Sequence, residues 1–540
     1  MKKMFFVVFI IAILLMFHVR ITRAAEDAVH IPEQVTIQRW SCMEVADLGV
    51  KKYDTARKLP HAVVEEGKPC FKSEIAACFF SVLERVVEKC DKEGVGAVAR
   101  DDLERIARLH EALKPELAGT EGYQARRDAI ERILAKPEEH AFALKAGIKV
   151  FTRGEGAGNF RLPDLAYNPG HAEGRYLYRV QPYVYWHPVE YLDIHLEGQG
   201  YGYTGGSQYL GKYSLYQGYV EGRLPGSDVL SLKAGRQEFV YGSTFILGSD
   251  SFFKGLSFDA ALLRVKPIEP LTVDFLGGWY ATPFSDGVEG TLVGGYASYV
   301  FAEGGVIEAY GFNDIGSADH YSGEYLNTWG LRGTVAFGPV SLEIEPVYES
   351  GRTFNGDTGR NDRINAWGGH ADVTVEAELL GRKNFFFASY AYGSGDRDAV
   401  NGISSRREFR NPNTDTSLTG DMNLIGDLSG VDAGESHASG LQIFNLGWGI
   451  ELTKELAFSA AARYFYANAV PDGFSKDLGL ETDFTLAYTV NEAISVLVGY
   501  DRFFTGKFFR DATGSNSDVD YGYAMLIFDL SKTWPRNRKG

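Results

Sequence analysis

Residues 480–490 alternate between apolar and polar side chains, and this alternation constrains the fold more than any other feature of the chain. One parity is mostly apolar, and the other is Glu481, Asp483, Thr485, Ala487 and Thr489. A period of two predicts a β-strand with one apolar and one polar face. A turn at Asn491-Glu492 and a second run, Ile494 to Phe504, complete a hairpin. Such long strands suit a closed barrel with lipid outside and water inside.

The same pattern recurs from Phe142 onward and predicts eighteen strands, an even number as expected for a single-chain bacterial barrel. The expected strands span 142–151, 175–186, 190–203, 211–223, 228–238, 255–266, 269–281, 291–301, 304–314, 324–336, 339–350, 364–378, 383–394, 438–452, 455–467, 477–490, 493–505 and 519–530. Short turns alternate with longer loops, which are expected at 152–174, 239–254, 351–363, 395–437 and 506–518. A soluble β-sandwich or propeller would need neither that alternation nor strands this long.

Composition excludes several other classes of protein. Hydrophobic residues make up 45% of the chain, so a helical membrane protein is not indicated. The net charge of −16 argues against nucleic acid as a partner. No G-x-S-x-G elbow, phosphate-binding loop, dinucleotide fingerprint or H-E-x-x-H zinc motif occurs in the sequence, so neither an enzyme nor a cofactor or metal is expected.

The N-terminal region reads differently from the barrel. Residues 1–25 resemble an export signal, with Lys2 and Lys3 before an apolar run and small residues at Ala24-Ala25. Residues 26–140 are expected to form a helical periplasmic module and linker, with helices near 72–90, 101–113 and 124–135. The barrel is assigned to 141–531 and a basic tail to 532–540, which predicts an outer-membrane protein in contact with lipid.

All four cysteines lie in this N-terminal region, at Cys42, Cys70, Cys78 and Cys90. An oxidising periplasm permits disulfides, and four cysteines allow three pairings. Disulfides are favoured over metal binding, because no C-x-x-C pair is present.

Parity along the strands assigns charged side chains of both signs to the interior. A barrel this wide cannot fill its interior with wall side chains alone, so a polar pore is expected. Paired or solvated structural charges are the alternative for any single residue. The pore-lining candidates from parity are Lys145, Lys149, Arg179, Asp193, Glu197, Lys233, Arg332, Glu343, Glu345, Asp372, Glu376, Arg463, Glu481 and Asp483.

The loop at 395–437 is the largest and is rich in aspartate. Its carboxylates are Asp396, Asp398, Asp415, Asp421, Asp427 and Asp432. Calcium binding is one reading, but the spacing matches no EF-hand, so a solvated outer loop is favoured. A loop of this length could also fold inward as a constriction.

Several short motifs in order resemble the alginate-export family of outer-membrane porins. They are Leu232 to Phe239 (LKAGRQEF), Tyr241-Gly242, Ile246 to Gly248, Leu256 to Asp259, Ala391 to Asp398 (AYGSGDRD) and the hairpin Leu478 to Gly506. The resemblance covers about 142–530 and implies an eighteen-stranded barrel whose founding members export the anionic polysaccharide alginate. It also adds Arg236, in the family's Gly-Arg-Gln motif, to the pore-lining candidates.

A second resemblance concerns residues 40–76. Trp40, Val45 to Leu48, Gly67 and Phe71 to Ala76 resemble a degenerate S-layer-homology module, a kind of module that attaches envelope porins to the cell wall. Lys72-Ser73 stands where that module has Thr-Arg. Two functions follow: a channel for polar or anionic solutes, possibly a polysaccharide, or a structural tether between the outer membrane and peptidoglycan or cell wall.

Overall fold

A computed structural model of the chain describes residues 72–134 and 143–534, with gaps at 94–97, 99, 114–116, 118–122, 163–164, 206–207, 228, 250–253, 269, 282–289, 303–304, 316–322, 380, 412, 417, 423, 454 and 492. The chain divides into two compact units, Met1–Glu139 and His140–Gly540. The export signal and nearly all of the S-layer-homology-like motif lie outside the described residues.

The first unit contains three described helices, α4 (Lys72–Glu93), α5 (Arg100–Ala112) and α7 (Tyr123–Leu134). They occupy the three ranges in which the sequence predicts helices. Their apolar stripes form one core that includes Phe79, Ile106 and Ile130, each at most 1% exposed. None of the described helices is both long and apolar enough to cross a membrane.

The helix bounds limit how the cysteines can pair. Cys78 and Cys90 both lie on α4, more than three turns apart. At 1.5 Å per residue this separation is about 18 Å, well beyond the roughly 7 Å between Cα atoms that a disulfide spans. A Cys78–Cys90 bond is therefore excluded. Cys42 and Cys70 lie outside the described residues, so the other two pairings stay predictions.

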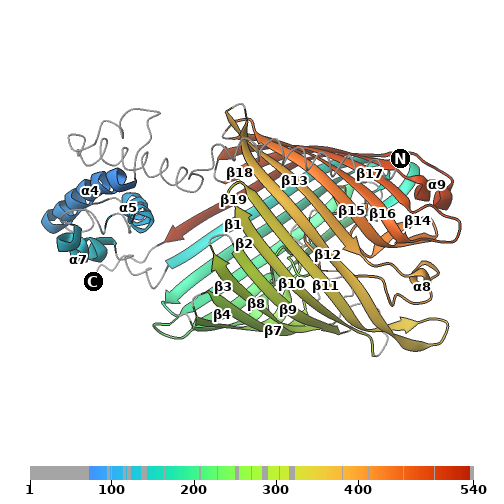
Figure 1. The fold of residues 1–540 in the computed structure, drawn as a ribbon, viewed down its shortest axis with the longest axis horizontal. Coiled ribbons are helices and arrows are strands. Elements are labelled where there is room, and N and C mark those ends of the chain that lie inside the picture. The colour runs from blue at the N-terminus through green and yellow to red at the C-terminus, as the bar shows by residue number, and fades with distance from the viewer. Residues whose placement is uncertain are drawn as a thin grey trace, which may run out of the picture. The chain divides into compact units, whose positions relative to one another are not determined.

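The second unit is a closed antiparallel barrel (Figure 1). Its strands are β1 (Ala143–Arg161), β2 (Ala166–Val189), β3 (Leu192–Gly205), β4 (Gln208–Arg223), β5 (Leu230–Gln237), β6 (Phe258–Ile268), β7 (Leu271–Tyr280), β8 (Thr291–Ala302), β9 (Gly305–Ile315), β10 (Tyr325–Phe337), β11 (Val340–Asn355), β12 (Arg360–Leu379), β13 (Arg382–Gly393), β15 (Ser436–Glu451), β16 (Leu456–Ala469), β17 (Asp477–Asn491), β18 (Ile494–Thr505) and β19 (Val519–Trp534). Each strand pairs with the next, and β1 pairs with β19. The short β14 (Gly430–Ala433) pairs only with β15 and stands outside the ring. The predicted eighteen-stranded barrel is confirmed.

Two predicted loops are strands instead. Residues 152–174 continue β1 and β2 up to a connection at 162–165, and residues 351–363 belong largely to β11 and β12. Both stretches are polar and rich in glycine, so they lack an apolar face. The backbone partners in the neighbouring strands keep them extended. Likewise β19 runs through Trp534, three residues past the predicted end of the barrel.

The connections at one end of the barrel are all short. The other end carries all the long connections and also a few short ones, such as 206–207 between β3 and β4. Two helices occur in the long connections, α8 (Arg397–Val400) and α9 (Lys507–Thr513). In bacterial barrels the short turns face the periplasm and the long loops face outward. We refer to these as the short-turn end and the long-loop end.

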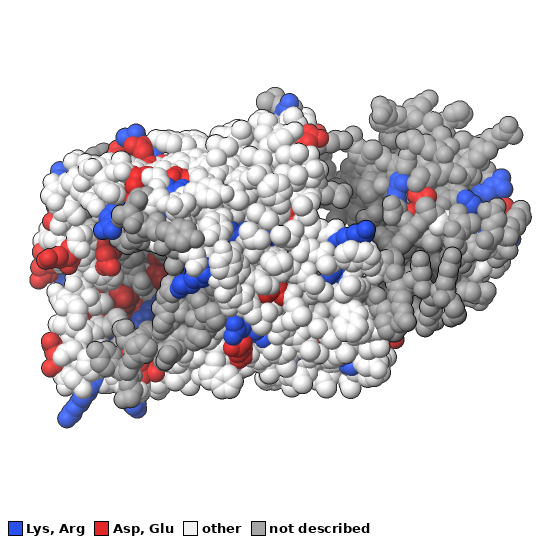
Figure 2. Space-filling model, turned by 180° about the vertical axis from the view of Figure 1, so that it is seen from behind, with Lys and Arg blue, Asp and Glu red and all other residues white. Residues whose placement is uncertain are grey.

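The outward face of the barrel carries exposed apolar side chains. Ile344 is 59% exposed and Trp279 is 66% exposed, whereas the inward Glu345 on the same strand as Ile344 is 2% exposed. Figure 2 shows a broad, mostly uncharged band on one side, with acidic side chains gathered toward the long-loop end. This is the surface of a barrel that spans a lipid bilayer.

We predict that Ile344→Arg destabilises the barrel in lipid. Ile344 lies on the outward face near the middle of the apolar band, where an arginine costs about 2–4 kcal/mol. The free energy of unfolding, measured by denaturant titration in vesicles, should fall by that amount. Ser350→Arg, on the same strand and face but closer to the long-loop end, should cost at most about 1 kcal/mol. Equal effects of the two variants would contradict this placement of the band.

Candidate functional site: the lumen and its inward loops

Two long connections fold into the barrel instead of extending away from it. We call them loop A (residues 238–257, between β5 and β6) and loop B (residues 394–435, between β13 and β15). Their apolar side chains join those of the inner wall in a single core. Its loop members are Phe239, Phe245, Leu247, Phe409, Met422, Leu424, Ile425, Leu428, Val431 and Ala433. The alternative that loop B is an inward constriction, rather than a solvated outer loop, fits the structure.

The two loops bind each other through their backbones. Leu247 and Asn413 form a parallel β-bridge, in which the Gly248 amide donates to the Asn413 carbonyl at 2.9 Å. The Asp415 amide donates to the Thr244 carbonyl at 3.0 Å. Loops A and B therefore form one assembly across the lumen.

A buried side chain, Asn411, reinforces this assembly. Its amide nitrogen donates to the Phe245 carbonyl in loop A at 3.3 Å. Its amide oxygen accepts from the Leu428 amide within loop B at 3.1 Å. Asn411 is 2% exposed, so its partners have no water to replace it.

Loop A is anchored to the wall by polar and aromatic contacts. The Tyr241 ring stacks on Tyr296 of β8 with 4.5 Å between ring centroids, and its hydroxyl donates to Asp274 of β7 at 3.0 Å. The Ser243 hydroxyl donates to Glu345 of β11 at 2.5 Å. These contacts place loop A against the wall formed by β7 to β12.

Loop B is anchored to this part of the wall and also to a distant part. The Arg410 amide donates to Glu349 of β11 at 3.1 Å. Tyr523 of β19 donates to Asp421 at 3.0 Å. Loop B thus reaches wall strands far apart in the ring, so it crosses the lumen.

The aspartates of loop B take protein donors rather than forming one cluster. Their partners are the Asp398 and Arg407 amides for Asp396, Arg406 for Asp398, Ser249 for Asp415, Tyr523 for Asp421, Ser429 for Asp427 and His437 for Asp432. Burial raises the pKa of the Asp427 carboxyl, because its charged form is desolvated there. Among the described residues, the group of side chains whose spacing could suit a metal ion lies in the barrel wall and not in loop B.

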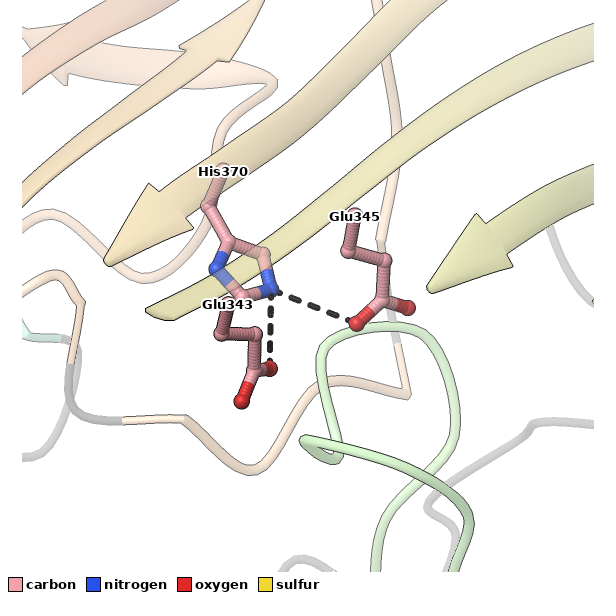
Figure 3. A group of neighbouring side chains, drawn as sticks. All are labelled: Glu343, Glu345 and His370. Carbon is pink, nitrogen blue, oxygen red and sulfur yellow. Dashed lines mark hydrogen bonds and ion pairs between the residues drawn. The ribbon is translucent and has the colours of Figure 1, made fainter. Parts of the chain in front are cut away.

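That group is Glu343, Glu345 and His370, on β11 and β12 (Figure 3). The His370 Nε2 lies 3.3 Å from Glu345 and 3.9 Å from Glu343. However, Arg332 of β10 donates to both oxygens of Glu343 at 2.8 Å and also contacts Glu308. The guanidinium already supplies the positive charge that a metal ion would bring, so this cluster is an internally paired network.

The candidates near the short-turn end face a wet interior. Lys149 binds Glu197 at 3.1 Å, yet 46% of the lysine side chain stays exposed while that of Glu197 is fully buried. Lys145 and Lys149 both lie over the inward ring of Tyr183, at 5.8 and 5.3 Å from its centroid. These lysines are inward-facing and accessible, as a channel interior requires.

Most of the other predicted pore residues also occupy inward positions. Asp193 binds His187 at 2.6 Å and contacts Arg223. Lys233 lies 4.6 Å above the Tyr219 ring. The remaining inward candidates and their contacts or positions are Arg179 over the Phe151 ring, Asp372 with His370, Glu376 on the same parity as Asp372, Arg463 with Asp483, and Glu481 with the Met422 amide.

Arg236 was predicted to line the pore, but the structure places it on the outer face. It pairs in register with Asp259 of β6, and its guanidinium donates to both carboxylate oxygens at 2.7 Å. The same face of these strands carries the register pair Leu232 and Leu263, which are 51% and 37% exposed. Arg236 therefore faces outward, one residue out of phase with the inward Lys233.

Sequence reasoning missed part of the interior. Arg153 and Glu155 of β1 bind each other at 3.1 Å, and Tyr521 of β19 donates to Glu155 at 2.6 Å. Arg175 of β2 also binds Glu155. Arg153 and Glu155 lie in the segment expected to be a loop, although they continue the parity of Lys145 and Lys149 along β1. Extending that parity would have found them.

A closed barrel with an apolar exterior and a polar, charged lumen defines an outer-membrane channel for solutes. The family model described as alginate export matches residues 212–522, more than half of the chain. The protein belongs to the alginate export family, as the resemblance in the sequence indicated. A search among curated proteins finds no significant match.

Solved porin structures share the fold. OccAB1 of Acinetobacter baumannii is 10% identical, covers 72% of this chain and 96% of its own, and has a TM-score of 0.51. A BenF-like porin of Pseudomonas fluorescens Pf-5 is 12% identical with coverages of 72% and 99% and a TM-score of 0.50. OccK9 (OpdG) of Pseudomonas aeruginosa is 13% identical with coverages of 72% and 98% and the same TM-score.

We predict that Asn411→Ala loosens the constriction. The substitution leaves a buried carbonyl and a buried amide without their partner, at about 1–3 kcal/mol each. Single-channel recordings in planar bilayers should show a higher mean conductance or more frequent openings than in the wild type. Asn401→Ala is the control, because the exposed Asn401 side chain donates to the Arg397 carbonyl within α8 and not to the other loop. Equal recordings from all three proteins would contradict a role of Asn411 in joining the loops.

Proposed function

We propose that the channel passes polar and anionic solutes, with an exported polysaccharide as the candidate that the family's description suggests. The observation that carries this proposal is the pair of accessible lysines, Lys145 and Lys149, on the inner wall near the short-turn end. Unlike the paired charges deeper in the wall, Lys145 has no carboxylate partner among the described residues. An anion entering from this end would meet a positive charge in water.

The polarity of the wall changes around the ring. Inward cations are concentrated on β1 to β6, namely Lys145, Lys149, Arg153, Arg175, Arg179, Arg223, Lys233 and Arg264. Carboxylates dominate the inward positions of β9 to β12 and of β17 and β18, namely Glu308, Glu343, Glu345, Glu349, Asp372, Glu376, Glu481, Asp483 and Asp501. Zones of opposite charge on the inner wall orient and select passing ions.

The apolar core shared by loops A and B bears on the size of the solute. Side chains such as Phe245 and Phe409, with rings 5.9 Å apart, are fully buried where the loops meet the wall. We propose that small solutes pass beside this assembly, and that a polymer passes only when the loops part. The loops would then act as a gate as well as a filter.

The lysines provide the test of this proposal. In a salt gradient, Lys145→Glu/Lys149→Glu should shift the reversal potential toward cation preference, because two positive charges in the lumen become negative. The control is Lys532→Glu. Lys532 pairs in register with Ala146 and therefore lies at the same height on the outer face. A shift of equal size in the control, or no shift in the double variant, would overturn the proposal.

We propose further that residues 26–140 form a periplasmic module and linker, supported by the separate helical core of α4, α5 and α7. The alternative function, a tether to peptidoglycan, rests on this module. A tether predicts that the full-length protein sediments with purified peptidoglycan and that residues 141–540 alone do not. A channel without wall attachment predicts that neither protein sediments.

A further inference from the structure

The outward face of β11 and β12 carries two arginines directly opposite each other. Arg352 and Arg363 are register partners, and both are exposed. Their parity is that of the outward Ile344 and Trp367, which are 59% and 56% exposed. Two like charges in a cross-strand pair repel each other and destabilise the sheet.

Two other outward arginines of the barrel, Arg236 and Arg502, have carboxylates beside them. Arg236 pairs with Asp259, and Arg502 binds Asp518 at 3.0 Å and Asp520 at 3.4 Å. By contrast, neither Arg352 nor Arg363 has an ion pair or hydrogen bond from its side chain to any described residue of the barrel. Two cations that face each other without a counter-charge form a site for an anion with several oxygens.

The surroundings of this pair show its level in the membrane. A row of aromatic side chains, Trp329, Tyr348 and Trp367, crosses β10, β11 and β12 in register, and the last two rings lie 4.5 Å apart. Rows of this kind sit at the level of the lipid headgroups. The arginine pair lies four residues further toward the long-loop end.

The distance between the arginine pair and the aromatic row bears on which kind of lipid phosphate the arginines can reach. Four residues correspond to about 13 Å along a strand, or about 10 Å along the membrane normal for an ordinary barrel tilt. A glycerophospholipid phosphate lies at the level of the aromatic row. In a phosphorylated glycolipid, the sugar stands between the acyl chains and the phosphate, so the phosphate lies on the outer side of the sugar, toward the arginines. The intervening register pair, Ser350 and Asn365, presents polar groups of the kind that bind sugar hydroxyls.

We propose that Arg352 and Arg363 bind a sugar-borne phosphate of a phosphorylated glycolipid in the outer leaflet, with the aromatic row beside the junction of its sugars and acyl chains. Each guanidinium donates to the phosphate oxygens, and the phosphate removes the repulsion between the two arginines. The site lies on the lipid-facing surface and is separate from the pore.

The test uses the full-length protein, refolded in detergent, with bisphosphorylated lipid A as the probe and native mass spectrometry as the readout. Arg352→Ala/Arg363→Ala should weaken binding about tenfold or more, since each charge-assisted contact contributes at least about a factor of ten. Arg502→Ala is the matched control, an outward arginine that has its own carboxylates, and should bind like the wild type. Arg352→Lys/Arg363→Lys should bind more tightly than the alanine double variant, because lysine keeps the charge, but more weakly than the wild type, because it lacks the paired donors of the guanidinium.

Two further arms identify the ligand. Dephosphorylated lipid A should bind the wild type about tenfold more weakly, and phosphatidylglycerol should compete poorly with lipid A. Equal affinity of the wild type and the alanine double variant would overturn the proposal, provided that both migrate as folded barrels in unheated gels. Equal affinity for dephosphorylated lipid A, or full competition by phosphatidylglycerol, would overturn it too.

Discussion

The structure depends on the closure of the backbone hydrogen-bond ladder between β1 and β19. In a bilayer no water satisfies a free strand edge, and each unpaired backbone group costs several kcal/mol. The register from Leu144 with Trp534 to Gly158 with Asp520 removes both edges. This requirement explains why polar, glycine-rich residues at 152–158 remain in a strand. It also explains why β19 continues to Trp534 rather than ending with its apolar alternation.

Closure with eighteen strands creates a second problem, because the interior is too wide for wall side chains to fill. The protein solves it in two ways. Near the long-loop end, loops A and B and the inner wall share an apolar core that includes Phe245 and Phe409. Along the rest of the wall, charges are paired across strands, as Arg332 is with Glu343 and Glu308. Pairing matters because a buried charge without a partner would be strongly unfavourable.

The cross-strand register also decides how charges on the outer face behave. Arg236 meets Asp259 and Arg502 meets Asp520, so these arginines are neutralised within the protein. Arg352 meets Arg363 instead. The same register that builds the wall therefore leaves one outward position with two adjacent cations, and the membrane itself is the source of a counter-charge.

The alternation in residues 480–490 and its repetition determined the fold class, the number of barrel strands and the positions of the short turns. They did so because a period of two is a local property that survives in any antiparallel sheet. Parity also assigned the inward face for residues such as Lys149 and Glu345. It did not reach Arg153 and Glu155, whose neighbours lack apolar side chains, and the family motif placed Arg236 on the wrong face. Tertiary structure alone decided how loops A and B meet across the lumen, and which charges pair. Those contacts join residues more than a hundred positions apart, such as Thr244 with Asp415, and no local pattern encodes them.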